Sequence, residues 1–355
     1  MTAVLLLLGV MLLYLGAEIL VRHASEFAAI LGISKLIVGL TIVAYGTSTP
    51  ELMVNIVASI NNSTDIAVGN IVGSNIFNIL FVLGASAIIC PLAVHRQIIR
   101  LDVPIMIGVS ALLWLIAFSR VLYFWTGILL LTGIIAYTLF VIDYSKKHSH
   151  VDVAQKKQKQ IDKKRLCTHL AWITLSLGVL TVGSECLVNG AIRLARIWGV
   201  SELIISLTII AAGTGLPELA TSILAAIRGH KEIAVGNIVG SNIYNILAIL
   251  GISTILAPAG LPISNSVLWI DLPVMVGAAV ACFPIFTTGH TIYRWEGCVL
   301  VFYYFLYVTH LILEATHHPF FTHFQDVVYI FLLPLTFIAL FARQLNQYLK
   351  KKSQI

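Results

Sequence analysis

The chain has 355 residues, of which 59% are hydrophobic and only 11% are charged. Because about a quarter of the residues in a soluble domain are charged, this composition excludes a soluble globular protein and indicates a polytopic membrane protein. The net charge of +6 does not indicate a nucleic-acid partner, since the basic residues are spread over loops and one basic linker that faces lipid headgroups.

Eleven apolar segments are long enough to cross a bilayer as α-helices, which takes about 17 to 25 residues. They centre near residues 12, 47, 78, 110, 132, 178, 214, 245, 278, 303 and 335. The first segment has no basic leader and no cleavage site, so we expect a retained helix rather than a signal peptide. The last, "VVYIFLLPLTFIALFA", is short and contains Pro334.

The distribution of basic residues predicts the orientation, because Lys and Arg collect in cytoplasmic loops. If the segments alternate, 19 of the 22 Lys and Arg residues lie on one side, and only Arg120, Arg193 and Arg196 lie on the other. We therefore expect an integral protein of the plasma (inner) membrane, with its N-terminus outside and its C-terminus cytoplasmic. Omitting the eleventh crossing would weaken this bias, which favours eleven spans.

The chain contains an internal repeat at an offset of 167 residues. "IAVGNIVGSNI" at 66–76 is identical to 233–243, and Glu51 aligns with Glu218. Since each copy holds five spans, an odd number, the second copy enters the membrane from the opposite side. We predict an all-α fold of two inverted five-helix repeats plus an eleventh transmembrane helix. Its parts are the first repeat (1–142), a basic cytoplasmic linker (143–166), the second repeat (167–315) and a C-terminal part (316–355) with an outward loop, the extra helix and a basic tail.

A carboxylate stands at mid-membrane in each copy. Thr47 in "AYGTSTPELM" lies about 18 to 21 Å from either end of its segment at roughly 1.5 Å per residue. Gly46 and Pro50 interrupt the helix, which exposes backbone carbonyls that must be satisfied by protein or by a cation. Thr47, Ser48 and Glu51 then lie near one another, and the second copy supplies Thr214 and Glu218.

These groups are all oxygen donors, which suits hard cations such as Ca²⁺ or Na⁺. Neither segment contains a Lys or Arg that could pair with Glu51 or Glu218. Two carboxylates at the midplane must therefore bind a cation or be protonated. The alternative is that these polar residues only pack helices, with neutral glutamates.

The repeated "GNIVGSN" stretches predict close helix contact through Gly69 and Gly73 and through Gly236 and Gly240. Ser74 and Asn78, with their counterparts Ser241 and Asn245, are spaced to turn polar side chains toward the same site. Hydrogen bonding between helices is the alternative role for these four residues.

On "GTSTPE" with "GNIVGSNIFN", and "GTGLPE" with "GNIVGSNIYN", the chain resembles the sodium/calcium exchanger superfamily of calcium/cation antiporters, in its compact prokaryotic form. The resemblance implies exchange of Ca²⁺ for Na⁺ by alternating access through clustered cation sites, with no enzymatic activity and no cofactor beyond the transported ions. It also implies a metal-binding set. The side-chain ligands would be Thr47, Ser48, Glu51, Thr214 and Glu218, and the carbonyl ligands would be those of Ala44 and Ala211. Ser74 and Ser241 would be outer Na⁺ ligands, and Asn78 and Asn245 would flank the centre.

Two positions depart from that family's pattern. Gly215 stands where the second repeat usually has serine, and Asn245 where several prokaryotic members have aspartate. Because Gly215 offers no hydroxyl, we expect weakened Na⁺ coupling and expect Gly215→Ser to raise the affinity for Na⁺.

Two other functions are compatible with parts of the sequence. One is Ca²⁺/H⁺ antiport with Glu51 and Glu218 as proton carriers. The other is a membrane metalloenzyme that uses His317, His318 and His323, but the chain lacks an HExxH motif. The chain also has no GxxxxGK[ST] loop, so we expect no P-loop site for ATP hydrolysis. The expected partners are inorganic cations and the lipid bilayer, and the sequence indicates no protein partner.

Overall fold

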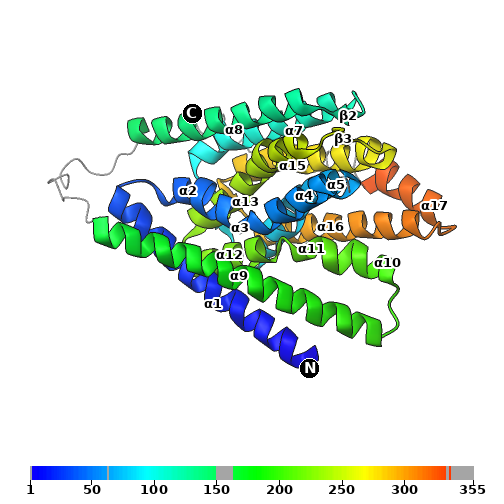
Figure 1. Cartoon of the computed structure of the whole chain (residues 1–355), viewed down its shortest axis with the longest axis horizontal. Helices are drawn as coiled ribbons and strands as arrows, with labels where there is room; N and C mark the ends of the chain where they lie inside the picture. The colour runs from blue at the N-terminus through cyan, green and yellow to red at the C-terminus, as the bar shows by residue number, and fades with distance from the viewer. Residues whose placement is uncertain (1, 62–63, 149–162, 333–335, 337–355) are drawn as a thin grey trace, which may run out of the picture.

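The computed structural model describes residues 2–61, 64–148, 163–332 and 336 as an all-helical protein (Figure 1). Within these residues, eight helices are long and apolar enough to cross a membrane, and two bent helix pairs bring the number to ten if each pair is one span. The basic linker is largely outside the described residues, as is most of the expected eleventh helix. The prediction of a helical membrane protein is confirmed.

The elements of the N-terminal half include three π-helical segments, labelled η. In chain order they are α1 (Thr2–Leu31), α2 (Lys35–Val38), η1 (Gly39–Val43), α3 (Ala44–Thr47), α4 (Thr49–Ile60), α5 (Thr64–Ile76), η2 (Phe77–Leu83), α6 (Gly84–Ile89), β1 (Leu92–Ala93), η3 (Ile98–Asp102), α7 (Val103–Ala117), β2 (Val121–Leu122) and α8 (Phe124–His148).

The C-terminal half repeats this order of elements and then continues beyond it. It consists of α9 (Lys163–Ile197), α10 (Glu202–Ile205), η5 (Ser206–Ile210), α11 (Ala211–Gly213), α12 (Leu216–Ile227), α13 (Lys231–Tyr244), η6 (Asn245–Leu250), α14 (Gly251–Leu256), β3 (Leu261–Pro262), η7 (Val267–Asp271), α15 (Leu272–Thr287), β4 (Thr291–Ile292), α16 (Arg294–Ala315), α17 (Phe321–Asp326) and η8 (Val327–Leu332).

Short antiparallel strand pairs connect loops from different halves of the chain. β1 pairs with β4, and β2 pairs with β3. The paired loops are separated by six spans in the first case and by four in the second, if each bent pair is one span. Both numbers are even, so each strand pair joins loops on the same side of an alternating bundle.

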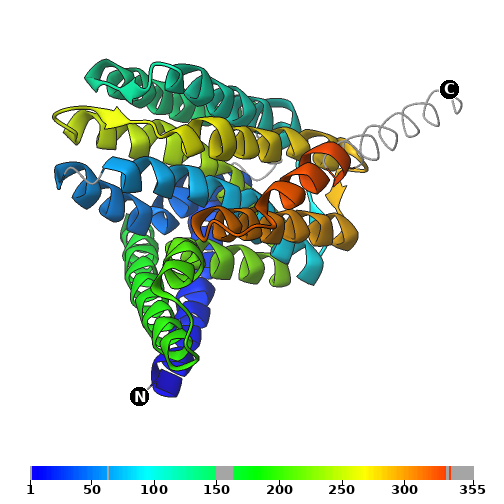
Figure 2. The ribbon, with the colours of Figure 1, turned by 90° about the vertical axis from the view of Figure 1, so that its right-hand side faces the viewer.

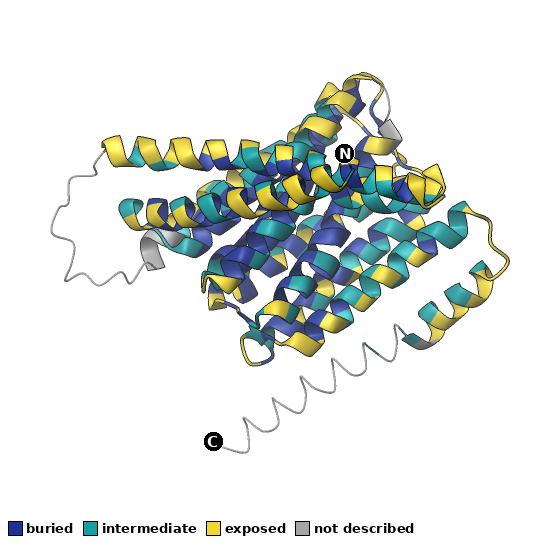
Figure 3. Cartoon of the chain, turned by 90° about the horizontal axis from the view of Figure 1, so that it is seen from below, coloured by how far each residue is buried: buried dark blue, intermediate teal, exposed yellow. Residues whose placement is uncertain are grey.

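The helices that carry the repeated motif lie at the centre of the bundle. The spans 66–89 and 231–256 are 78% and 83% buried inside the protein, whereas the spans of α8, α9 and α16 are mostly uncovered. Figure 3 shows buried residues on the inner helices and exposed residues on the outer ones. The exposed side chains include Leu7, Leu139 and Phe305, which fits a surface that faces hydrocarbon.

α1 and α9 pack against each other along much of their length and project from the rest of the bundle (Figure 2). Glycines make this contact close. A Cβ on Gly16 would lie 2.8 Å from a Leu180 side-chain carbon, and one on Gly183 would lie 2.9 Å from the backbone nitrogen of Leu13. Since these positions have no side chain, the two backbones can approach.

Candidate cation site

Both halves contain a helix that is broken within the bundle. The α2 to α4 segment bends by 44° at Ser48, and the α10 to α12 segment bends by 48° at the Thr214–Gly215 step. Pro50 and Pro217 each stand in the first turn of the helix that follows the break. Proline has no N–H to donate and is tolerated in the first turn, so the chain ends one helix and starts another at this depth.

The breaks bring two buried carboxylates toward one another. Glu51 and Glu218 are 1% and 0% exposed, and they are close enough to interact electrostatically. The Ser48 hydroxyl donates to Glu218 Oε1 at 2.9 Å. Among the described residues, neither carboxylate lies within 4.0 Å of a Lys, Arg or His nitrogen. The protein thus buries two acids without a basic partner, which is costly unless a proton or a cation neutralises them.

In the described part of the chain, several buried oxygens of the predicted set have no hydrogen-bond partner. They are Glu51 Oε2, Glu218 Oε2, Thr214 Oγ1, Asn78 Oδ1 and Asn245 Oδ1. A buried polar atom without a partner costs about 1 to 3 kcal/mol, so five from a single residue set need an explanation. Two carboxylate oxygens, one hydroxyl and two amide oxygens are ligands that Ca²⁺ and Na⁺ prefer.

Other residues of the predicted set are already hydrogen-bonded. Thr47 donates to Asn237 Oδ1 at 3.1 Å, and Ser241 donates to the carbonyl of Ala44 at 3.4 Å. That carbonyl also accepts the backbone N–H of Ser48 at 3.1 Å. Ala44 and Ser74 are buried, whereas Ala211 is exposed. The structure therefore gathers most of the set around the two breaks but leaves Ala211 at the surface.

Asparagines that the sequence interpretation did not single out support this site. Asn75 Nδ2 donates to the carbonyl of Asn242 at 3.3 Å, and Asn75 Oδ1 accepts from Asn245 at 3.1 Å. Asn237, besides its contact with Thr47, donates to Ser222 at 3.0 Å. All three asparagines fall in the identical "GNIVGSN" segments, so identity between the copies was the signal that could have found them.

The repeated glycines pack closely in only one copy. A Cβ on Gly240 would lie 2.5 Å from the carbonyl oxygen of Leu40, and one on Gly236 would lie 2.9 Å from that of Leu36. Gly69 and Gly73 have nothing within 4 Å of the equivalent position. The predicted close contact is therefore right for α13 and wrong for α5, because the segment equivalent to α2 and η1 does not cover α5.

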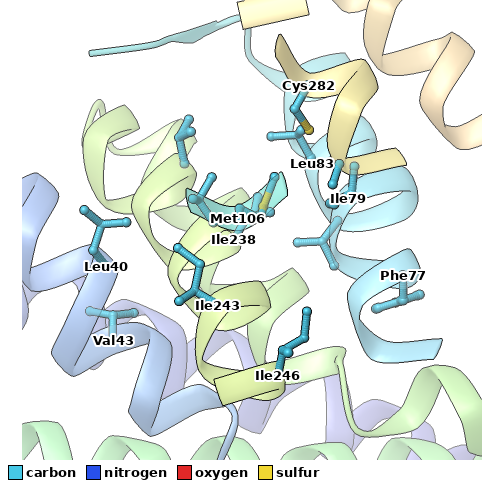
Figure 4. Packing of buried hydrophobic residues seen from close by; sticks show 14 of the residues in the cluster. Leu40, Val43, Phe77, Ile79, Leu83, Met106, Ile238, Ile243, Ile246 and Cys282 are labelled. Atoms are coloured by element: carbon cyan, nitrogen blue, oxygen red, sulfur yellow. The ribbon is translucent and has the colours of Figure 1, made fainter. Parts of the chain in front are cut away.

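Apolar side chains and one polar contact stabilise the packing of α13 against α2 and η1. Leu40 and Val43, both in η1, face α13, which carries Ile238 and Ile243 (Figure 4). At the end of this contact, Lys35 Nζ lies 3.2 Å from His230 Nδ1. Burial, and then the charge of Lys35, lowers the pKa of His230, so the neutral ring accepts this bond.

By contrast, η5, the counterpart of η1 in the C-terminal half, is less buried. η5 has no buried residue, and Leu203 and Ile210 are 43% and 49% exposed. The contact between the broken helix and the repeated motif is thus tight in one half and loose in the other.

An aromatic ring occupies the space beside Gly215. A Cβ at this position would lie 2.5 Å from Phe77 Cδ1, and Phe77 is 3% exposed and stacks on Phe81. The counterpart of Phe77 at the 167-residue offset, Tyr244, stacks instead on Tyr45. Phe77 fills the volume that a serine side chain at position 215 would need, so the expected rise in Na⁺ affinity on Gly215→Ser stays a prediction that also requires Phe77 to move.

The histidines considered for a metalloenzyme lie elsewhere. His317, His318 and His323 are exposed near α17, and in the described part of the chain they do not bring three ligand atoms together.

Comparison with known proteins places this arrangement in a family. The profile described as "Sodium/calcium exchanger protein" matches residues 1–142 and 168–313. The chain is 40% identical over 301 residues to a protein of Alkalimonas amylolytica named "Putative antiporter CaxA", covering 83% of this chain and 93% of that protein. It is 32% identical over 335 residues to the sodium/calcium exchanger MaX1 of Methanosarcina acetivorans, covering 84% and 95%.

A solved structure is similar over most of its length. The sodium-calcium exchanger NCX_Mj, soaked with 10 mM Na⁺ and zero Ca²⁺, superposes with a TM-score of 0.75 at 28% identity, covering 87% of this chain and 98% of that one. With the profile matching most of the sequence, the chain belongs to the sodium/calcium exchanger family.

Proposed function

We propose that this protein is a secondary antiporter that moves Ca²⁺ across the membrane in exchange for Na⁺. The observation that carries the proposal is the pair Glu51 and Glu218, buried at the two helix breaks. Within the described residues neither has a basic partner, and one oxygen of each is unpaired. The cost of burying these charges is met when the transported cation binds. The family relatives named as sodium/calcium exchangers support the same cargo.

The residues have different roles in this proposal. Glu51, Glu218, Thr47, Ser48 and Thr214 hold the ions with side-chain oxygens, and Ala44 and Ala211 add backbone carbonyls. Ser74 and Ser241 serve outer Na⁺ positions, and Asn78 and Asn245 flank the centre. The unpaired oxygens of Thr214, Asn78 and Asn245 support this assignment.

We also propose that the two halves are inverted repeats of each other. Matching contacts support this. Gly84 packs on Gly297, and Gly251 packs on Gly127. A buried and a partly buried aspartate likewise each accept from a tyrosine: Tyr137 of α8 donates to Asp102 at 3.0 Å, and Tyr307 of α16 donates to Asp271 at 2.8 Å.

Inverted repeats give a simple route to alternating access. If the halves exchange roles, α5 closes onto η5 while α13 leaves η1, and the site opens to the opposite side. In the proposed orientation, with the basic loops in the cytoplasm, α5 and α10 begin on the outer side. A cysteine at Ser264 should then react with an impermeant label only from outside, and one at Arg96 only from the cytoplasm. Reaction in the reverse sense would invert the topology.

Coupling to H⁺ instead of Na⁺ is the second candidate, and Gly215 favours it. The first half offers Ser48 to the site, whereas the second half has Gly215 with Phe77 against it. One neutral oxygen is therefore missing for Na⁺. Ca²⁺ depends more on the two glutamates.

The test is ⁴⁵Ca²⁺ flux in proteoliposomes that hold the purified protein. An outward Na⁺ gradient should drive Ca²⁺ uptake at constant pH. Uptake driven only by a pH gradient would replace Na⁺ by H⁺ as the coupling ion. Absence of uptake under either gradient, with the protein shown to be folded, would overturn the proposed antiport.

A further inference from the structure

Three metal-ligating side chains meet at one end of the α1 and α9 pair, outside the candidate cation site. His23 and Glu26 lie on the last two turns and a half of α1, and His169 lies in the second turn of α9. One ligand atom from each residue can be chosen so that all three lie within 4.8 Å of one another. The two Nδ1 atoms of His23 and His169 are 2.8 Å apart, and His169 Nε2 is 3.4 Å from Glu26 Oε2.

We propose that His23, Glu26 and His169 bind a divalent transition-metal ion, such as Zn²⁺, which ties the end of α1 to the start of α9. Two imidazoles and one carboxylate are a ligand set that Zn²⁺ accepts, with a fourth position left for water. Imidazole nitrogen selects against Ca²⁺ and Na⁺, which prefer oxygen, so this site and the candidate transport site take different ions.

The surroundings hold the ligands in place before an ion binds. The ring of Trp172 stacks on His23 with centroids 5.5 Å apart and planes 10° from parallel. The side chain of His169 is only 14% exposed. The two carboxylate oxygens of Glu26 have different partners: Oε1 lies 3.4 Å from Arg22 Nε, and Oε2 lies 3.4 Å from His169 Nε2. Arg22 thus orients the carboxylate without using the oxygen that faces the histidines.

The cluster is not part of the internal repeat. At the 167-residue offset, His23 corresponds to Gly190 and Glu26 to Arg193. Gly190 instead packs against Leu6. The transport machinery occurs in two copies and this cluster in one, so the proposal stands apart from the proposed function and does not depend on which ion is exchanged.

The test is Co²⁺ binding to the purified full-length chain in detergent, in the presence of excess Ca²⁺ to occupy the oxygen sites. We expect one Co²⁺ per chain with the visible absorption bands of an imidazole-bound ion, displaced by Zn²⁺. We also expect Zn²⁺ to raise the Tm in a concentration-dependent way, since a ligand that binds only the folded state stabilises it.

Matched variants decide the outcome. His23→Gln and His169→Gln should lose the absorption bands and the Zn²⁺-dependent rise in Tm, and the control His317→Asn, at an exposed histidine, should keep both. If either glutamine variant fails to fold, Glu26→Gln at a half-exposed position serves instead, with at least about tenfold weaker binding expected for the loss of a charged ligand. Binding that is absent in the wild type, or equal in wild type and variants, would overturn the site.

Discussion

The same eleven-residue sequence, at 66–76 and at 233–243, makes two different contacts in one molecule. In α13 it packs closely along α2, η1 and α3, with backbone carbonyls of Leu36 and Leu40 against its glycines. In α5 its glycines face open space. The covering segments, however, are not identical: Gly39, where a Cβ would lie 2.9 Å from the carbonyl oxygen of Ile233, corresponds to Ser206 in the other half. Under the proposed alternating access, the two halves would have to exchange these contacts.

Among the variants that compare the two halves, the largest effect is expected from adding a methyl group to each of these glycines. In Gly240→Ala the new Cβ meets rigid backbone at 2.5 Å, so we expect a lower Tm and at least about tenfold less Ca²⁺ flux, in line with overpacking costs of about 1 to 3 kcal/mol. Gly73→Ala meets nothing here and should leave the Tm unchanged or higher. It should still reduce flux, because α5 must pack closely when the site opens to the other side.

Gly108→Ala is the matched control, since Gly108 is exposed in α7 and also has nothing within 4 Å. It should change neither the Tm nor the flux. Wild-type flux in Gly73→Ala would show that the two halves do not exchange these contacts.

A smaller effect is expected at the hydroxyl that distinguishes the two breaks. Ser48→Ala removes the 2.9 Å hydrogen bond to Glu218, and a bond to a charged group contributes about 1.5 to 3 kcal/mol. We expect about tenfold weaker Na⁺ binding, measured as the Na⁺ midpoint of Ca²⁺ efflux. Thr49→Ala is the control, because the Thr49 hydroxyl donates to the carbonyl of Tyr45. Equal midpoints in the two variants would remove Ser48 from the site.

The smallest effect is expected at Gly215. Gly215→Ser alone should lower the Tm and leave the Na⁺ midpoint within about threefold of the wild type, because its side chain competes with Phe77 for space. Combined with Phe77→Ala, the serine side chain has room. The Na⁺ midpoint should then fall by a few-fold, because one neutral hydrogen-bonding group contributes about 0.5 to 1.5 kcal/mol. Phe77→Ala alone is the control. If the double variant matches it, the missing hydroxyl does not limit Na⁺ binding.

Local chemistry made much of this fold predictable. Hydropathy predicted the spans, the internal identity predicted matched halves, and Gly46 and Pro50 predicted the break in the first half. The burial of Glu51 and Glu218 without a basic partner also followed from the absence of Lys and Arg in their segments. Each of these features depends on the residues of one segment.

Features that depend on the packing between segments were not predictable. Nothing in two identical sequences could show that Gly240 is covered and Gly73 is open. The position of Phe77 against Gly215 joins residues 138 apart, and the exposure of Ala211 depends on which segments pack over it. Both features follow from contacts between distant segments, which local sequence patterns do not specify.

The most direct test of the account is Ca²⁺ binding to the purified protein, measured by isothermal titration calorimetry in wild type, Glu51→Gln and Glu218→Gln. If both glutamates bind one Ca²⁺, either variant alone should bind Ca²⁺ at least about 100-fold more weakly, since the charge of the ligand set controls Ca²⁺ affinity. Glu202→Gln, at an exposed acid paired with Arg196, should bind like the wild type. Wild-type Ca²⁺ affinity in either buried variant would contradict a site shared by the two halves.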